Sequence, residues 1–220
     1  MRIIMPQVPR ECLDQILVVD ASTDGTANYA RSIGCDVVRQ SRPGLHAAYA
    51  EAFPHVRGEF VLTFSPDGNS PPEAIPRLIE KISEGHDMVI ASRYLPPAQS
   101  EDDDGLTAFG NHLFTHAINL LHGESWSRPY TDAMVIYRIY RTRLYYELAL
   151  DAPDAYAPEK FFRTFLGVEP LLSVRAAHAN CRIAEIPVDE PPRLHGRRKL
   201  QIFRWGAAYM AQILRETLRK

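Results

Sequence analysis

The stretch ILVVDASTDGT (residues 16–26) predicts the end of a buried strand, a turn and the start of a helix. Its first five residues form a short, β-rich apolar run that ends in the acid Asp20. Ser22 and Asp24 are residue types that cap the first turn of a helix, and this helix is expected to end near Gly34. An acid at the end of a strand and beside the start of a helix suits the binding of a nucleoside. Its carboxylate can accept a hydrogen bond from a ribose hydroxyl or from an N–H of the base. The same pattern also fits an ordinary strand–turn–helix connection.

The alternation of strand and helix continues through the next seventy or so residues. Further strands are expected at 36–39, 59–64 and 87–92, and further helices at 44–53 and from Pro71 to about Ile82. Strands that alternate with helices of this length predict an α/β fold, with a largely parallel sheet and helices on both faces. Ligands of such sheets bind beyond the carboxyl ends of the strands, where Asp20, Asp67 and Arg93 stand.

The pattern changes after Tyr94. An irregular acidic loop spans 95–105, and a helix is expected from Thr107 to about His122. A strand running into a helix is expected around 134–140, and a long helix or helix pair from Pro158 to about Ala177. A strand over 182–188 and a last helix from Leu200 onward complete the predicted elements.

Composition and charge limit the class of protein. The chain has 220 residues, 45% hydrophobic and 24% charged, as in a soluble globular protein. It contains neither a long apolar segment nor a secretory signal pattern, and its three cysteines lie far apart, which together predict a cytoplasmic location. Residues 193–220 carry a net charge of +7 and the rest of the chain −9. The basic segment predicts an anionic partner, either a phosphate or an anionic lipid surface, unless it is only a solvated helix end.

The segment FSPDGNSPPE (64–73) predicts a second connection of the same kind, in which a polar loop with an acid follows a strand and precedes a helix. Asp67 and Asn69 offer two oxygen ligands to a hard divalent cation, which often takes few carboxylates and completes its shell with water and substrate phosphates. Ser65 stands where a second acid would be useful, and a hydroxyl is a poorer ligand. The alternative is a turn in which Asp67 and Asn69 bond to their own backbone.

Taken together and in order, these segments resemble the family-two inverting glycosyltransferases of the GT-A fold, most closely the branch of the polyprenyl-phosphate (dolichol-phosphate) mannose synthases. The matching stretches cover nearly the whole chain: VVDASTDGT, the Gly44 helix, SPDGNSPPE, ASRY, TDAMVIYRIYR and RLHGRRKL. The resemblance implies a Rossmann-like α/β fold with a mixed, mostly parallel sheet. It also implies one domain over residues 1–220, with a nucleotide-sugar half to about residue 94 and an acceptor half after it.

The resemblance also implies roles for particular residues. The donor would be held by Asp20, Ser22, Asp24, Gly44 and Asp67, and Mg²⁺ or Mn²⁺ by Asp67 and Asn69. Phosphates of donor and acceptor would be bound by Arg93, Asn111, Arg193, Arg198 and Lys199. Arg93 and Lys199 would neutralise the leaving diphosphate, and Asp132 is the candidate base if the acceptor is a hydroxyl.

The expected reaction is transfer of a hexose from a GDP- or UDP-linked donor, with inversion, to an acceptor such as a polyprenyl phosphate. The basic last helix would touch the inner face of a membrane, and no nucleic-acid partner is expected. Its Trp205, Tyr209, Ile213 and Leu214 are expected to pack mainly in the core.

Three departures from the family pattern stand beside this expectation. Ser65 replaces the first acid of the metal motif, and Asn111 stands where mannose synthases tend to carry an arginine. The first fifteen residues are too few for the strand and helix with which the family usually begins, so an N-terminally shortened fold is expected. The alternative function is therefore a truncated or degenerate relative that binds a nucleotide, or another partner, without catalysis. A nucleotidyltransferase is disfavoured because its glycine-rich N-terminal loop is absent.

Overall fold

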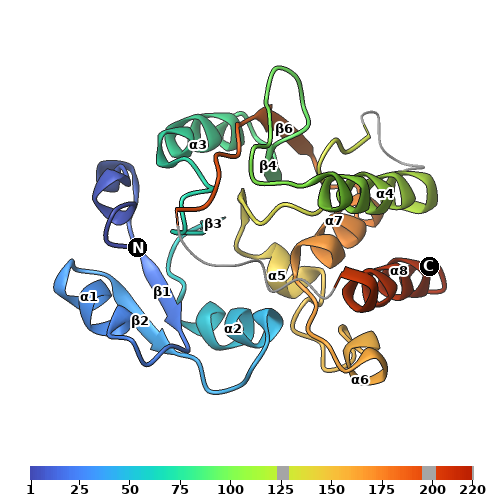
Figure 1. The fold of residues 1–220 in the computed structure, drawn as a ribbon, viewed down its shortest axis with the longest axis horizontal. Coiled ribbons are helices and arrows are strands. Elements are labelled where there is room, and N and C mark those ends of the chain that lie inside the picture. Colours follow the sequence, from blue (N-terminus) through green and yellow to red (C-terminus); the bar gives the residue numbers. More distant parts are fainter. Residues whose placement is uncertain (123–128, 195–201, 220) are drawn as a thin grey trace.

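The first part of the chain alternates short strands and helices (Figure 1). The computed structural model describes residues 1–122, 129–194 and 202–219. Its elements up to residue 92 are η1 (Met5–Gln7), η2 (Arg10–Cys12), β1 (Leu17–Asp20), α1 (Thr26–Ser32), β2 (Asp36–Arg39), α2 (Leu45–Ala52), η3 (Phe53–His55), β3 (Phe60–Thr63), η4 (Pro72–Ala74), α3 (Ile75–Ser83) and β4 (Met88–Ser92). The strands and helices predicted for this part are confirmed to within a few residues.

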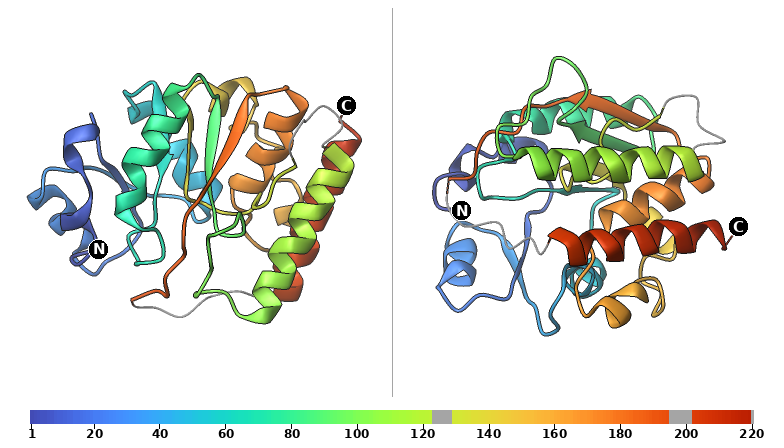
Figure 2. Two further views of the ribbon diagram at one scale, coloured as in Figure 1. Left: turned by 90° about the horizontal axis from the view of Figure 1, so that it is seen from above. Right: turned by 45° about the vertical axis from the view of Figure 1, so that its right-hand side comes forward.

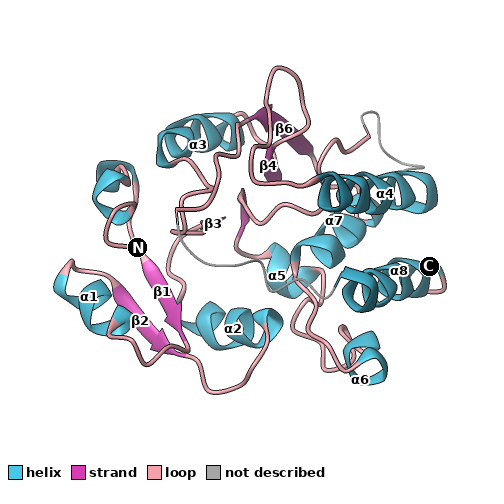
Figure 3. Cartoon of the chain, viewed as in Figure 1, coloured by secondary structure: helices cyan, strands magenta, loops and turns pink. Residues whose placement is uncertain are grey.

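The second part is mainly helical (Figure 3). It comprises α4 (Gly105–His122), β5 (Arg138–Arg141), α5 (Leu144–Glu147), α6 (Pro158–Phe162), α7 (Glu169–His178), β6 (Ile183–Pro187) and α8 (Ile202–Thr217). The predicted helix pair over 158–177 is confirmed as α6 and α7. The two are separate because Arg163 adopts a left-handed conformation, with φ of 49°, directly after α6.

The strands form two sheets. β1 and β2 pair in parallel, whereas β3, β5, β4 and β6 form a four-stranded sheet in that spatial order. β5 runs antiparallel to both of its neighbours, and β6 is parallel to β4, so three of these four strands point the same way. The α/β fold with a mixed, mostly parallel sheet is therefore confirmed.

The sequence did not predict the division into two sheets. Within residues 1–122, all of which the structure describes, no strand precedes β1, since the chain before it forms the short turns η1 and η2. Neither β1 nor β3 pairs with a described strand on its second edge. Both strands are half-buried over most of their length, whereas every residue of β4 is buried between β5 and β6.

The core lies between the four-stranded sheet and its helices. On α3 the residues Ile75, Leu78 and Ile82 recur at helical spacing and are almost fully buried, and α3 packs against β4 and β5. A buried cation also ties this region together: the guanidinium of Arg138 donates to the carbonyls of Ala133 and Val135 and to the hydroxyl of Ser173. Arg138 thereby joins β5 to the loop before it and to α7.

Replacement of Leu78 by alanine tests this packing. Leu78 is completely buried, so its removal should lower the free energy of unfolding by about 2–5 kcal/mol, as measured by urea denaturation. Glu80→Ala on the exposed side of the same helix is the matched control and should change it by less than about 0.5 kcal/mol. Equal effects of the two substitutions would contradict the packing of α3.

Candidate active site at the strand ends

The fold brings five segments to one edge of the four-stranded sheet. The loop of Asp67 follows β3, Arg93 follows β4, and residues 188–190 follow β6. Because β5 is antiparallel, the residues just before it, including Asp132, reach the same edge. The acidic loop before α4 joins them through Asp103. Of the three residues predicted to converge on one sheet edge, Asp67 and Arg93 do so, and Asp132 lies with them. The prediction is wrong for Asp20, which ends β1 in the separate two-stranded sheet.

Arg93 is the centre of this cluster. Its Nε and Nη2 donate to the two carboxylate oxygens of Asp132 at 2.6 and 3.0 Å. Its Nη1 lies 3.3 Å from both oxygens of Glu190 and 3.6 Å from Asp103. Burial alone would lower the pKa of the Arg93 guanidinium, but the surrounding carboxylates raise it, so the side chain stays charged. The charge that was predicted to face a phosphate is thus directed at protein carboxylates.

Asp132 is fully buried and is bound by Arg93 through both oxygens. Its backbone N–H donates to Glu185, which lies on β6 and also accepts from Thr131. A carboxylate held in this way orients the arginine. It is a poor general base in this arrangement, because taking up a proton would break the buried ion pair.

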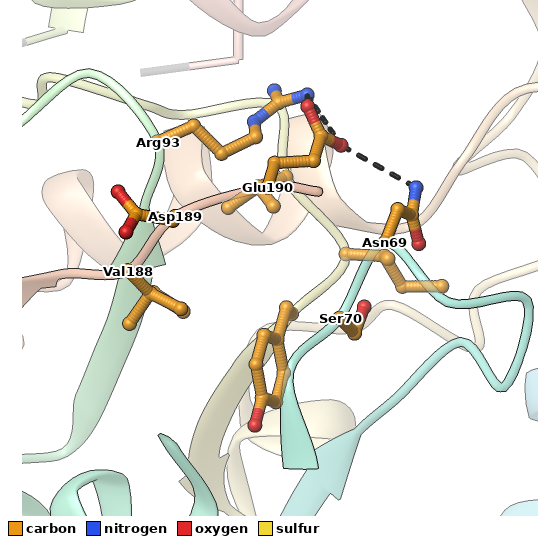
Figure 4. A pocket seen from close by; sticks show the side chains of 10 residues that line it. Asn69, Ser70, Arg93, Val188, Asp189 and Glu190 are labelled. Carbon is orange, nitrogen blue, oxygen red and sulfur yellow. Dashed lines mark hydrogen bonds and ion pairs between the residues drawn. The ribbon is translucent and has the colours of Figure 1, made fainter. Parts of the chain in front are cut away.

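Glu190 is a site residue that the sequence analysis missed. It accepts from Arg93 and Ser100, and the amide of Asn69 donates to it at 3.4 Å (Figure 4). Burial raises the pKa of its carboxyl group, and the Arg93 charge offsets part of that rise. Its signal in the sequence is its place just after a strand, in VDEPP, which is the same signal that identified Asp67.

The predicted metal loop is folded as a tight turn. The backbone N–H of Asn69 lies 3.5 Å from the Asp67 carboxylate, which is the longest separation that still counts as a hydrogen bond. The Oδ1 atom of Asn69 is buried and has no hydrogen-bond partner among the described residues. Gly68 has φ of 109°, and a Cβ there would lie 2.8 Å from the side chain of Leu194, so only glycine fits this close approach.

The segment after β6 passes over this loop. The N–H of Leu194 donates to the Asp67 carbonyl at 2.9 Å, and the Arg193 guanidinium lies 3.5 Å from the Asp67 carboxylate. Arg193 also donates to Asp102 at 3.0 Å. Among the arginines predicted for the phosphates, Arg193 is therefore the one placed beside the predicted metal ligand. Arg198 and Lys199 lie outside the described residues.

The predicted nucleoside-binding residues lie together at the end of β1. Asp20 accepts from the Ser22 N–H at 3.0 Å and from Arg39, and Asp24 accepts from the Ser22 hydroxyl at 2.6 Å and from the Thr26 N–H at 3.0 Å. Although burial alone would raise it, the contacts with Ser22 and Arg39 lower the pKa of Asp20. Asp24 thus accepts from the first N–H of α1, but the N-cap residue is Gly25, without a side-chain cap, so the alternative interpretation of Asp24 as the N-cap is wrong.

Two other predicted residues are held by neighbours. Gly44 has φ of 104° and begins α2, and a Cβ there would lie 2.7 Å from the Phe165 ring. Asn111 on α4 donates to the hydroxyl of Tyr94 and to Asp103, both at 3.0 Å. The arrangement connects α4 with the loop that follows β4.

Two hollows lie near these residues. A small cavity of about 20 Å³ is enclosed by the Asn69–Ser70 turn, Arg93 and residues 188–190, which is room for about one water molecule (Figure 4). A larger hollow of about 500 Å³ lies along β1 and β2 and is lined by Leu17, Val37 and Arg57 among others. None of the predicted site residues lines the larger hollow.

The described part of the chain contains no group of three or more His, Cys, Asp or Glu side chains placed to hold a metal ion. In the same part of the chain, no helix combines the length and the apolar character needed to cross a membrane.

Ligands of an α/β sheet bind beyond the carboxyl ends of its strands, which is where these acids, the amide and the arginines lie. Comparison with known families identifies the domain: residues 7–163 match the model of glycosyl transferase family 2. The chain belongs to this family, and the predicted class of enzyme, a glycosyltransferase, is confirmed at that level.

Individual relatives are similar at 27–29% identity. Glycosyltransferase AglJ of Haloferax volcanii is 27% identical over 82% of this chain and 55% of its own length. An undecaprenyl-phosphate 4-deoxy-4-formamido-L-arabinose transferase of Edwardsiella ictaluri is 29% identical over 84% of this chain and 52% of its own length. A dolichyl-phosphate hexose transferase of Haloferax volcanii is 28% identical over 93% and 81%. The chain thus spans about half the length of the first two.

Solved structures support the same fold. Mannosyl-3-phosphoglycerate synthase from Rubrobacter xylanophilus superposes with a TM-score of 0.62 at 21% identity, covering 94% of this chain and 64% of the other. Glucosyl-3-phosphoglycerate synthase from Mycobacterium tuberculosis, solved with Mn²⁺, UDP-glucose and phosphoglyceric acid, gives 0.57 at 19% identity over 93% and 69%. The GT-A fold expected from the sequence is confirmed.

Replacement of Asp132 by alanine tests the buried ion pair. It leaves the Arg93 charge buried without its principal partner and should cost about 3–5 kcal/mol in free energy of unfolding. Asp67→Ala removes a half-exposed ion pair and should cost less than about 1 kcal/mol. Urea denaturation measures both, and a small loss in Asp132→Ala would show that the pair does not hold the site together.

Asp24 gives a prediction for the dependence of stability on pH. Hydrogen bonds from Ser22 and Thr26 lower its pKa from 3.8 to about 2. The unfolded chain therefore binds this proton more readily, so the stabilisation by the carboxylate is present above about pH 4 and lost as the pH falls toward about 2. Asp24→Asn does not titrate, so the stability advantage of the wild type over the variant should shrink across that interval in urea denaturation. An advantage that is constant with pH would contradict the lowered pKa.

Proposed function

We propose that this protein transfers a hexose from a nucleoside-diphosphate sugar to a phosphate-bearing acceptor, with inversion at the anomeric carbon and with the help of a divalent cation. The observation that carries the proposal is the meeting of Asp67, Asn69 and Arg193 at one sheet edge in a chain of glycosyl transferase family 2. In a single displacement, an acceptor oxygen attacks the anomeric carbon as its bond to the diphosphate breaks.

Asp67 and Asn69 would hold the cation, Mg²⁺ or Mn²⁺. The buried Oδ1 of Asn69 has no hydrogen-bond partner in the described part of the chain and stands two residues from Asp67, and carboxylate and amide oxygens are the ligands of a hard cation. Two protein oxygens suffice when diphosphate and water oxygens complete the shell. When bound, the cation supplies Lewis-acid stabilisation of the leaving diphosphate. The structural neighbour solved with Mn²⁺ and UDP-glucose supports this assignment.

Arg193 is the residue best placed to stabilise the leaving group. Its guanidinium already lies beside Asp67, and 30% of its side chain is exposed, so a diphosphate can reach it. Arg198 and Lys199 follow within six residues and are proposed to add positive charge at the same place. Arg93 is proposed to act from inside the protein, by fixing Asp132 and Glu190 and through them the Asn69 turn.

The nucleoside is proposed to lie at the end of β1, beside Asp20, Ser22 and Asp24, with the Gly44 turn next to it. β1 lies in a sheet separate from that of β3, so this placement rests on the position of the three residues at the carboxyl end of β1. GDP- and UDP-linked hexoses are both compatible with this chemistry.

A phosphate is the acceptor favoured by the state of Asp132. Since Arg93 binds both oxygens of Asp132, this candidate base is not ready to activate a hydroxyl, whereas an ionised phosphate is already a nucleophile. The names of two relatives, a dolichyl-phosphate hexose transferase and an undecaprenyl-phosphate transferase, support a polyprenyl phosphate. The enzyme would then act in the cytoplasm, at the inner face of a membrane.

One observation favours a second candidate, a non-catalytic domain that binds nucleotides. Both Arg93 and Asp132 are engaged with each other, so neither is available to a ligand in this arrangement. The two candidates differ in one property: only the enzyme releases nucleoside diphosphate from a sugar donor when an acceptor is added.

Replacement of Asp67 by alanine tests the proposed donor site. With GDP- or UDP-hexose and Mn²⁺, the wild type should show a metal-dependent rise in melting temperature, because a ligand of the folded state stabilises it. Asp67→Ala should lose this rise, since it removes the only carboxylate of the turn.

Asp14→Ala, at an exposed acid before β1, is the matched control and should keep the rise. An unchanged metal-dependent shift in Asp67→Ala would exclude Asp67 as the ligand. Release of nucleoside diphosphate on addition of polyprenyl phosphate, measured in the same samples, separates the enzyme from the binding domain.

A further inference from the structure

Helices α4 and α8 form an outer layer on the side of the molecule opposite the N-terminus (Figures 1 and 2). They run in the same direction, since Phe114 of α4 lies against Gly206 and Tyr209 near the start of α8, and His122 Nε2 donates to the Ile213 carbonyl further along. Each helix buries one side toward the core, through Thr115, Ile118 and His122 on α4 and Ala208, Gln212, Ile213 and Glu216 on α8.

The outward side of α4 carries large apolar side chains together with the exposed His112 and His116. Residues 105–122 contain no Asp, Glu, Lys or Arg. At 3.6 residues per turn the exposed large residues fall within a sector of about 60°. They are Leu106, Phe109, Leu113 and Leu120, with exposed fractions of 48, 64, 43 and 70%. The exposed face of a helix in contact with water normally carries charged and polar residues, and this face differs from that pattern.

The outward side of α8 continues this surface. Phe203, Leu214 and Leu218, the last just beyond the helix, are 87, 49 and 87% exposed, and Ala207 lies exposed between them. The expected apolar stripe of this helix is corrected in part: Ile213 is in the core as predicted, but Leu214 points outward. Because both helices bury their opposite sides, the two exposed stripes face the same way, on either side of the Phe114–Gly206 contact.

Basic residues border this α4–α8 face along the far side of α8. Arg204, Arg215 and Arg219 recur there, and Lys160 and Arg163 are exposed on the neighbouring α6 segment. Arg215 and Arg219 share Asp154 as an ion-pair partner, and Arg219 also lies 4.0 Å from Glu216. Arg204 donates to the carbonyls of Phe162 and Arg163, which do not neutralise its charge. An apolar stripe with a basic border matches the interface of a bilayer that contains anionic lipid.

We propose that the α4–α8 face is the surface by which the protein docks onto an anionic lipid bilayer. The apolar side chains of both helices enter the headgroup layer, and the arginines along α8 lie against lipid phosphates. More than half of the exposed large apolar side chains of the described chain gather on this face, which is unusual for a surface that contacts only water.

The inward side of α4 connects this surface to the candidate site. Asn111 points from α4 to Asp103 and Tyr94, and Asp103 lies beside Arg93. A phosphate carried by a lipid would therefore reach the candidate site from the side of the fold that α4 covers. This link to the acceptor rests on the function proposed above, whereas the docking surface rests on exposure and charge alone.

Binding to vesicles tests the proposal. The full chain should sediment with phosphatidylcholine vesicles that contain phosphatidylglycerol, and several-fold less with phosphatidylcholine alone or at high salt. Phe109→Glu and Leu120→Glu should each lower the partition coefficient into vesicles about tenfold. Each replaces an apolar side chain that enters the bilayer by a charged one. Both side chains are exposed in the free protein, so folding should be retained, and circular dichroism checks this.

Ile3→Glu is the matched control. Ile3 is 54% exposed and lies near the N-terminus, away from the α4–α8 face (Figure 1). Its vesicle binding should equal that of the wild type. Equal vesicle binding by the wild type and all variants would overturn the proposal. So would a wild type that does not bind vesicles but forms a dimer, if Phe109→Glu dissociates that dimer. The assay contains neither donor nor acceptor, so a failure of the proposed sugar transfer would leave its result unaffected.

Discussion

The site is organised around a buried positive charge that the protein itself must neutralise. Arg93 holds Asp132 through two hydrogen bonds and meets Glu190 and Asp103 with the rest of its guanidinium. These partners come from the loop before β5, the end of β6 and the loop before α4. Since an unpaired charge in this position is costly, the three segments cannot move independently. The same cluster also fixes the turn that contains Asn69, because Asn69 donates to Glu190.

The two described arginines of the site, Arg93 and Arg193, therefore differ in their surroundings. The guanidinium of Arg93 is buried among protein carboxylates, whereas the side chain of Arg193, which pairs with Asp102 and Asp67, remains 30% exposed. The same difference holds for the acids: Asp132 is enclosed and paired, and Asp67 remains at the surface of its turn. A rigid interior cluster beneath a polar, accessible loop is a suitable arrangement for binding a charged donor, because the loop is positioned before the ligand arrives.

Much of this could be predicted from the sequence, because strand–helix alternation and strand-end acids are local signals. Asp67 and Arg93 were identified by such signals, whereas Asp132 was identified only through the resemblance to the family. The pairing of Arg93 with Asp132 was not predicted, because the two lie 39 residues apart and only the antiparallel course of β5 brings them together. Glu190 was missed because VDEPP resembles a loop without a role. The exposed stripe of α4 was missed for a related reason: an apolar period predicts a helix face, but not whether the core or the outside receives it.

The separation of β1 and β2 from the other four strands has a consequence for how the molecule opens. No backbone ladder in the described chain joins the two sheets, so the β1–β2 unit is held by side-chain packing, by the covalent link through α2 and by contacts such as that of the Met1 amino group with Pro66. Its amide protons at Val18 and Val37 can exchange with solvent through a local opening that leaves the ladder around β4 intact. The acids at the end of β1 thus belong to a cooperative unit of their own, less protected than the sheet that carries Arg93.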